Sequence, residues 1–291
     1  MEANLPGQAL LPARPAQRVA RRALPRMPAS LVAGMLILMA WLLVTVFVPL
    51  FVGRSAESVS YGKKLLAPSS MFLFGTDALG RDVLVRTATA FRSDLEIAAG
   101  SVAVAAVAGL LLGALAGSSS EWVDNIVMRI LDVLSAFPSF ILALTLAGAL
   151  GASVGTVIIS IAVVLMPQFA RGGRAAVLSE RAQPYAEAAR AMGFSPARVV
   201  LVHLLPNSLG PALTQAAMDM ATAMMVAAGL SFIGFGVQPP TPEWGLMINE
   251  GSSYIVSGQW WVTFFPGLAI LSVVTGFILA DDGIKRMRGE G

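Results

Sequence analysis

Stretches of about 20 or more apolar residues alternate with polar segments along most of this 291-residue chain. A helix needs about 20 apolar residues to cross the hydrocarbon core of a bilayer. Hydrophobic residues make up 56% of the chain and charged residues 13%, whereas soluble domains carry about 25% charged residues. The pattern predicts an all-α polytopic membrane protein with six transmembrane helices.

Residues 1–30 contain five Arg and five Pro and are expected to form a disordered cytoplasmic tail. The expected membrane helices are 31–52, 95–117, 126–150, 152–170, 205–235 and 261–280. The segments between and after them are an external segment at 53–94, a cytoplasmic loop at 171–204, an external loop at 236–260 and a cytoplasmic C-terminus at 284–291. Residues 92–283 are expected to form a core of five membrane helices.

The distribution of Lys and Arg predicts the orientation in the membrane. With the N-terminus inside, the inner segments carry most of these side chains, and the external loop 236–260 carries none. Both termini are therefore expected in the cytoplasm. The first apolar run exceeds the 7–15 residues of a signal-peptide core and lacks a clear cleavage site, so it is expected to remain as a membrane helix.

Two sequence patterns concern the packing of these helices. Gly109, Gly113 and Gly117 form a doubled GxxxG register, which lets another helix approach closely. Packing within the chain is favoured over a dimer interface for this register. Pro138 lacks a backbone N–H and is expected to bend the helix predicted at 126–150.

Several kinds of chemistry are excluded by what the chain lacks. It has no Cys and a single His, so disulfides, thiolate catalysis and Cys or His metal clusters are excluded. There is no Gly-x4-Gly-Lys-Ser/Thr phosphate-binding loop, so ATP is not expected to be hydrolysed here. With a net charge of +3, no nucleic-acid partner is indicated. No catalytic or metal-binding residues are assigned, and the chain is not expected to be an enzyme.

The polar loop contains the pattern of a bent pair of helices. Pro184 suits a first helical turn, strong helix formers follow, and Gly193 can adopt a positive φ that ends the helix. Ser195 and Pro196 then suit an N-cap and a first residue of a second helix. A rigid bent element of this kind can transmit a push from a soluble partner to a membrane helix.

The residues of this loop resemble the "EAA" loop of ABC importer permeases. Glu187-Ala188-Ala189, Gly193 and the run His203-Leu-Leu-Pro206-Asn207 match it in type and spacing. In that family the loop is a short cytoplasmic helix that docks on an ATPase. The resemblance assigns an ATPase-coupling role to Ala186, Glu187, Ala188, Ala189, Gly193, His203, Pro206 and Asn207.

Three further motifs resemble the oligopeptide, dipeptide and nickel permeases of this family, in the family's order. Residues 74–86 resemble its GTDxxGRDxxSR signature, with Val85 in place of Ser. Residues 230–245 are similar to LSFLGLGVQPPTPxWG, and residues 260–268 resemble the WW…PG approach to the last membrane helix. The chain is identified as similar to the second, C-type permease of such importers.

The resemblance implies a type I ABC importer permease fold in the bacterial cell membrane. It implies a second permease, two ABC ATPase subunits or domains that bind ATP and Mg, and an external substrate-binding protein as partners. Oligopeptides are the expected substrate, with dipeptides, nickel chelates and glutathione-like compounds remaining open. Departures from the family pattern bear on the substrate, among them Asp281-Asp282-Gly283 where Gly-Asp-Gly is commoner.

Two further groups of residues are candidate sites. Ser208, Gln215, Asp219 and Thr222 share one helical stripe and are candidates for lining the substrate path, or else for polar contacts between helices. Pro239, Pro240, Pro242 and Trp244 in the external loop are candidates for docking the binding protein, or else form a structural plug anchored by Trp.

The expected function is import by alternating access, energised by separate ATPase subunits. The alternative is a secondary transporter driven by an ion gradient, in which Asp219 would carry a proton. Against this alternative, the sequence has no recognisable inverted repeat and few charges within its membrane segments.

Overall fold

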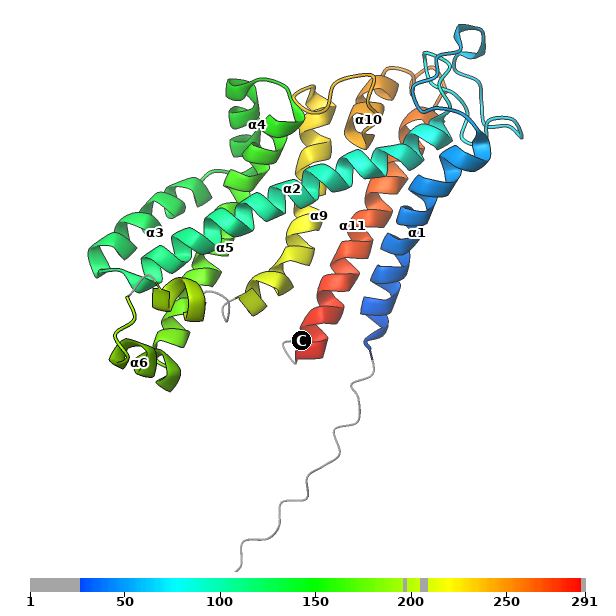
Figure 1. Cartoon of the computed structure of the whole chain (residues 1–291). Helices are drawn as coiled ribbons and strands as arrows, with labels where there is room; N and C mark the ends of the chain where they lie inside the picture. Colours follow the sequence, from blue (N-terminus) through cyan, green and yellow to red (C-terminus); the bar gives the residue numbers. More distant parts are fainter. Residues whose placement is uncertain (1–26, 196–197, 205–208, 289–291) are drawn as a thin grey trace, which may run out of the picture.

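The computed structural model describes residues 27–195, 198–204 and 209–288, and these ranges are helical apart from turns and connecting loops (Figure 1). An isolated bridge joins Thr76 and Asp82. The helices are α1 (Ala29–Val52), the 3₁₀ turn η1 (Tyr61–Lys63), α2 (Val83–Ser118), α3 (Glu121–Ser135), α4 (Ser139–Leu150), α5 (Val154–Arg181), α6 (Pro184–Ala191), the π-helix η2 (Val199–Leu204), α9 (Leu209–Ile233), α10 (Trp244–Ser252) and α11 (Trp261–Arg288).

Among the described residues, five helices are long and apolar enough to cross a membrane. They are α1, α2, α5, α9 and α11. The sixth expected helix, 126–150, is not continuous: α3 and α4 meet at an angle of 93° and pass the same test only as a pair. The prediction of one bent helix at 126–150 was wrong, because the chain forms two separate helices there. Pro138 stands at the N-cap of α4, because its ring and missing N–H prevent α3 from continuing.

Three predicted helix boundaries and one predicted loop also differ from the structure. α2 begins at Val83 rather than at 95, because the Asp82 carboxylate caps it by accepting bonds from the N–H groups of Leu84 and Val85. α5 continues to Arg181, well into the loop predicted at 171–204, and α11 continues to Arg288. The external loop 236–260 contains the helix α10.

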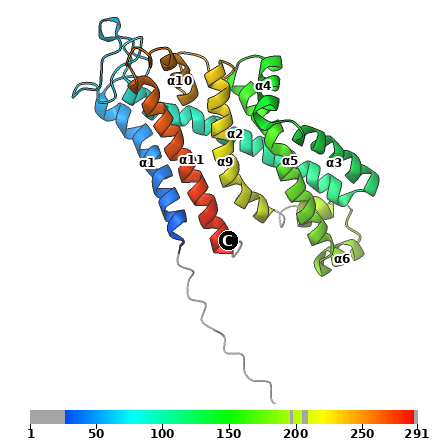
Figure 2. The same ribbon diagram turned by 180° about the vertical axis from the view of Figure 1, so that it is seen from behind.

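The helices form a layer that α2 crosses. α5, α9, α11 and α1 stand side by side in that order, and α2 runs obliquely across them, as both views show (Figures 1 and 2). α3, α4 and α6 lie around α5. The first residues of α1, the last residues of α11 and α6 lie at one end of the molecule, here named the α6 end. Residues 53–82 and α10 lie at the opposite end, named the α10 end.

Glycines bring α2 against α5, its most extensive partner. A Cβ atom at Gly109 would lie 2.6 Å from Phe169 Cβ, and one at Gly113 would overlap the Ala170 carbonyl oxygen. At Gly117 a Cβ would lie 3.1 Å from the Arg174 carbonyl oxygen. The doubled GxxxG register therefore packs within the chain, as predicted.

We expect Gly113→Ala to destabilise the protein, because its methyl group would push α5 away from α2. Overpacking of this kind costs about 1–3 kcal/mol, whereas Ala otherwise favours a helix. The matched control is Gly172→Ala, since Gly172 on α5 has nothing within 4 Å of an added Cβ. Thermal unfolding in detergent should show a lower midpoint for the first variant alone. Equal midpoints would contradict the tight α2–α5 contact.

Candidate functional site: the loop between α5 and α9

The loop after α5 forms the predicted bent pair of helices. α6 starts at Pro184, as expected, and Gly193 follows it with φ of +80°. A positive φ is strained for residues with a Cβ, so glycine suits this turn. The Ser195 hydroxyl accepts a bond from the Arg198 N–H at 3.4 Å, immediately before η2. Pro196 lies outside the described residues.

The two faces of α6 differ sharply in burial. Ala186 is 0% exposed and Ala189 is 3% exposed, and both pack into a small apolar cluster. The rest of this cluster comes from α2, α5 and η2, through Ala114, Val177 and Val199. Glu187 and Ala188 lie on the exposed face of α6. The Glu-Ala-Ala motif thus presents the Glu187 carboxylate and the Ala188 methyl group outward, while its third residue, Ala189, and the preceding Ala186 fix the helix.

Ion pairs and hydrogen bonds tie the base of this loop to other helices. The Arg181 guanidinium donates to the Gly117 carbonyl oxygen at 2.8 Å, which joins the end of α5 to the end of α2. Arg174 on α5 makes a two-point ion pair with Asp124 on α3. These contacts connect the base of the loop with α2 and α5, and Arg174 connects α5 with α3.

The other predicted coupling residues are only partly placed. Gly193 is exposed at the turn between α6 and η2, and His203 belongs to η2. Pro206 and Asn207 lie outside the described residues, as does Ser208 of the predicted path-lining stripe.

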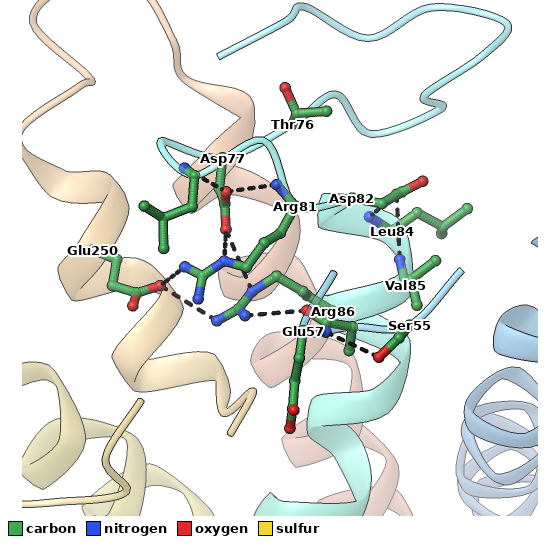
Figure 3. Close-up of polar contacts among 12 residues, drawn as sticks. Ser55, Glu57, Thr76, Asp77, Arg81, Asp82, Leu84, Val85, Arg86 and Glu250 are labelled. Atoms are coloured by element: carbon green, nitrogen blue, oxygen red, sulfur yellow. Dashed lines mark hydrogen bonds and ion pairs between the residues drawn. The ribbon is translucent and has the colours of Figure 1, made fainter. Parts of the chain in front are cut away.

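At the α10 end, a cluster of buried charges fixes the chain before α2 (Figure 3). Asp77 Oδ1 accepts bonds from the N–H groups of Leu79 and Arg81, both at 2.9 Å, and Asp77 also pairs with the Arg81 side chain. Glu250 of α10 reaches Arg81 at 2.7 Å and Arg86 at 3.3 Å. The GTD…GRD motif therefore folds back on itself and binds α10.

Arg86 is the centre of this charge cluster. It is 1% exposed, lies 3.6 Å from Asp77 and donates to the Ala56 carbonyl oxygen at 3.3 Å. A buried guanidinium without partners is costly, so these contacts hold the 53–82 segment, α2 and α10 in one arrangement. The sequence motif pointed to Arg81 and Arg86, but it did not reveal that Glu250 is their shared partner.

The predicted external docking residues divide into exposed and buried members. Pro239 and Pro240 are exposed, whereas Pro242 and Trp244 are buried. Trp244 is 0% exposed, packs against the rings of Trp41 and Phe91, and donates from Nε1 to the Thr87 carbonyl oxygen at 2.9 Å. A surface contact by Trp244 was therefore a wrong prediction. The ring is apolar enough to be buried, and its one donor is satisfied inside the protein.

The predicted stripe on α9 faces the interior at its centre. Asp219 is 2% exposed, and Gln215 Nε2 donates to its Oδ1 at 3.3 Å. Gln215 and Thr222 are half-buried, and the Thr222 hydroxyl donates to the Met218 carbonyl oxygen at 3.2 Å. A second buried carboxylate, Asp281 on α11, acts electrostatically on Asp219. The sequence showed Asp281 as a departure from the family pattern but did not connect it with Asp219.

Comparisons with known proteins agree with this geometry. Residues 109–286 match the model of a family described as the binding-protein-dependent transport system inner membrane component. The chain is 37% identical over 254 residues to a dipeptide transport system permease protein of Alkalihalophilus pseudofirmus, covering 87% of this chain and 83% of the relative. It is 39% identical over 218 residues to a glutathione transport system permease protein of Pectobacterium atrosepticum, covering 75% of this chain and 72% of the relative.

A probable D,D-dipeptide transport system permease protein of Escherichia coli K12 is also 37% identical, over 87% of this chain and 85% of its own length. Among solved structures, the fold is similar to a chain of the MetNI methionine ABC transporter, with a TM-score of 0.53 and 23% identity. This match covers 72% of the present chain and 96% of that chain. The predicted all-α ABC importer permease fold is confirmed, and the chain belongs to the family of inner membrane components of binding-protein-dependent transport systems.

Proposed function

We propose that this chain is a permease subunit of an ATP-binding-cassette importer that brings peptides into the bacterial cell. The observation that carries the proposal is the seated α6 helix, whose buried alanines fix it to α2 and α5 while Glu187 faces outward. Such an element can receive a push from outside the membrane and pass it to membrane helices.

The proposed energy source is a pair of ABC ATPase subunits or domains that bind ATP and Mg and contact the exposed face of α6. The complex further contains a second permease and an external binding protein. The α6 end is then cytoplasmic, and with it both chain termini. This orientation agrees with the distribution of Lys and Arg, and it places the Arg86 cluster outside.

In the proposed cycle, α2 connects the two sides of the membrane. It has 36 residues and is therefore about 54 Å long. Its inner end contacts the α6 cluster through Ala114, and its outer end carries Arg86. Closure of the ATPases would displace α6 and tilt α2 and α5, and hydrolysis would reset the inward state, as alternating access requires. The binding protein would deliver cargo at the α10 end, where Pro239 and Pro240 are exposed.

Peptides are proposed as cargo because relatives are named as dipeptide, di/tripeptide and peptide permeases. The glutathione relatives fit the same class, since glutathione is a small peptide-like molecule. An ion-gradient-driven carrier would not require a helix such as α6, which buried alanines fix in place and which exposes Glu187 and Ala188. The complex reconstituted in proteoliposomes should transport peptide only when ATP is present on the side of the membrane that the α6 end faces. Uptake driven by an ion gradient without ATP would overturn the proposal.

We expect Glu187→Lys to weaken binding of the ATPase at least tenfold, equivalent to about 1.4 kcal/mol, because it reverses a charge on the exposed face of α6. The matched control is Glu121→Lys, an exposed residue at the start of α3 near the same end of the molecule. Co-purification from membranes in mild detergent measures the bound ATPase. If both variants retained the same amount of ATPase, Glu187 would not be part of the interface.

We expect Ala186→Leu to loosen α6 and Ala188→Leu to leave it in place, although both add the same side chain. Ala186 is buried in the apolar cluster and Ala188 is exposed. Overpacking the cluster costs about 1–3 kcal/mol. Trypsin cleavage of the permease between residues 181 and 198 should accelerate severalfold for Ala186→Leu alone. Similar cleavage rates for the two variants would contradict the seating of α6 described here.

A further inference from the structure

Two carboxylates are buried inside the helical layer, on the neighbouring helices α9 and α11. Asp219 is 2% exposed and Asp281 is 5% exposed. At 1.5 Å per residue, Asp219 lies about 15 Å from the start of α9 and Asp281 about 10 Å from the end of α11. Both of these helix ends lie at the α6 end of the molecule (Figure 2). The pair thus occupies the half of the permease nearer to the ATPase-coupling loop.

The hydrogen bonds of the pair are incomplete. Asp219 Oδ1 accepts from Gln215 Nε2 at 3.3 Å, and Asp281 Oδ2 pairs with Lys285 Nζ at 2.7 Å. The other oxygen of each group, Asp219 Oδ2 and Asp281 Oδ1, is buried without a hydrogen-bond partner in the part of the chain that the structure describes. Each carboxylate therefore has one acceptor atom left for a further donor or cation.

The charges around the pair do not balance. Asp219 and Asp281 repel each other, and the Lys285 ammonium compensates one of them. Among the described residues, one negative charge then remains at a buried site, where an uncompensated charge is very unfavourable. A single monovalent cation would neutralise the remaining charge and would give both unused carboxylate oxygens a partner.

The chemistry of the site favours an ammonium group or an alkali cation over a divalent metal. Ca²⁺ takes six to eight oxygen ligands and commonly several carboxylates. Here two carboxylates are present, one already bound to Lys285. Lys285 shows that the site accepts an ammonium at hydrogen-bond distance, and an ammonium has three donors to share. Gln215 and Thr222 lie half-buried on the same stripe of α9.

We propose that Asp219 and Asp281 form a binding site for one monovalent cation on the inner half of the transport path. Its occupant is the terminal ammonium of the peptide cargo or a free alkali cation. The inference rests on the proposed function, because the cargo must pass this site. A cation bound here would be released when α9 and α11 separate, which links occupancy of the path to movement at the α6 end.

The test compares Asp219→Asn and Asp281→Asn with Asp282→Asn in the complete complex in proteoliposomes. Asp282 is the neighbouring carboxylate on α11, but its side chain is 42% exposed and pairs with Arg286 at 2.9 Å. Uptake is measured for a tripeptide with a free amino group and for its N-acetylated form, in sodium and in choline buffers. The ratio of variant to wild type for each cargo cancels any preference of the binding protein.

If the cargo ammonium occupies the site, the two pair variants lower uptake of the free-amine peptide about tenfold and leave that of the acetylated peptide unchanged. If an alkali cation occupies it, wild-type uptake of both cargos depends on sodium, and the pair variants remove this dependence. The proposed site would be overturned if Asp219→Asn and Asp281→Asn showed the same uptake as Asp282→Asn for both cargos in both buffers. ATP-driven uptake by the wild type in that case would leave the proposed function intact.

A second measurement reports binding without transport. Carbodiimide modifies a carboxyl group in its protonated form, so a bound cation should protect Asp219 and Asp281 from labelling. Mass spectrometry of the labelled wild-type complex should show protection by sodium chloride or by free-amine peptide. Equal labelling with and without these ligands would mean that the pair holds a proton alone, and it would also overturn the proposal.

Discussion

The buried ion pairs of Arg81 and Arg86 with Asp77 and Glu250 are the constraint on which the α10 end depends. Residues 53–82 have only the short turn η1 as regular structure, so helical hydrogen bonds do not hold them. The guanidinium groups supply this order instead, because losing either carboxylate would leave two buried cations to share one carboxylate. The same contacts place α10 over the start of α2. Residues 53–82, α10 and the start of α2 are thus fixed together.

α2 carries this constraint across the protein. The third of α2 nearest the α10 end is held by ion pairs. The third nearest the α6 end is held by glycines that let α5 approach to backbone contact. Side chains at Gly109 or Gly113 would separate the two helices, so rigidity at this contact comes from the absence of side-chain atoms. A helix held at both ends moves as one body. This property makes the small α6 cluster at its inner end a suitable point for applying force.

Hydropathy predicted the membrane helices and helix-forming residues predicted α6, because both properties are local. The start of α2 was missed because Arg86, Arg92 and Asp94 make residues 83–94 look like a polar loop. Arg86 and Asp94 are buried, and their burial depends on partners far away in the sequence, Glu250 for Arg86 and the Trp244 N–H for Asp94. Trp244 was misplaced for the same reason. Asp219 was predicted as a site residue, but its relation to Asp281 appears only when α9 and α11 pack.

Two sets of buried charges among the described residues, the Arg86 cluster and the pair Asp219 and Asp281, differ in whether all of their buried carboxylate oxygens have partners. At the α10 end each guanidinium has carboxylate partners, so the cost of burial is offset and the arrangement is stable. Between α9 and α11 two carboxylate oxygens lack partners in the described chain, so the packed helices alone do not offset the cost. Ionisable residues within membrane segments are candidates for function, and the cation proposed above would supply the missing partner. The satisfied cluster holds α2 at the α10 end, and the unsatisfied pair lies in the half of α9 and α11 nearer to the α6 end.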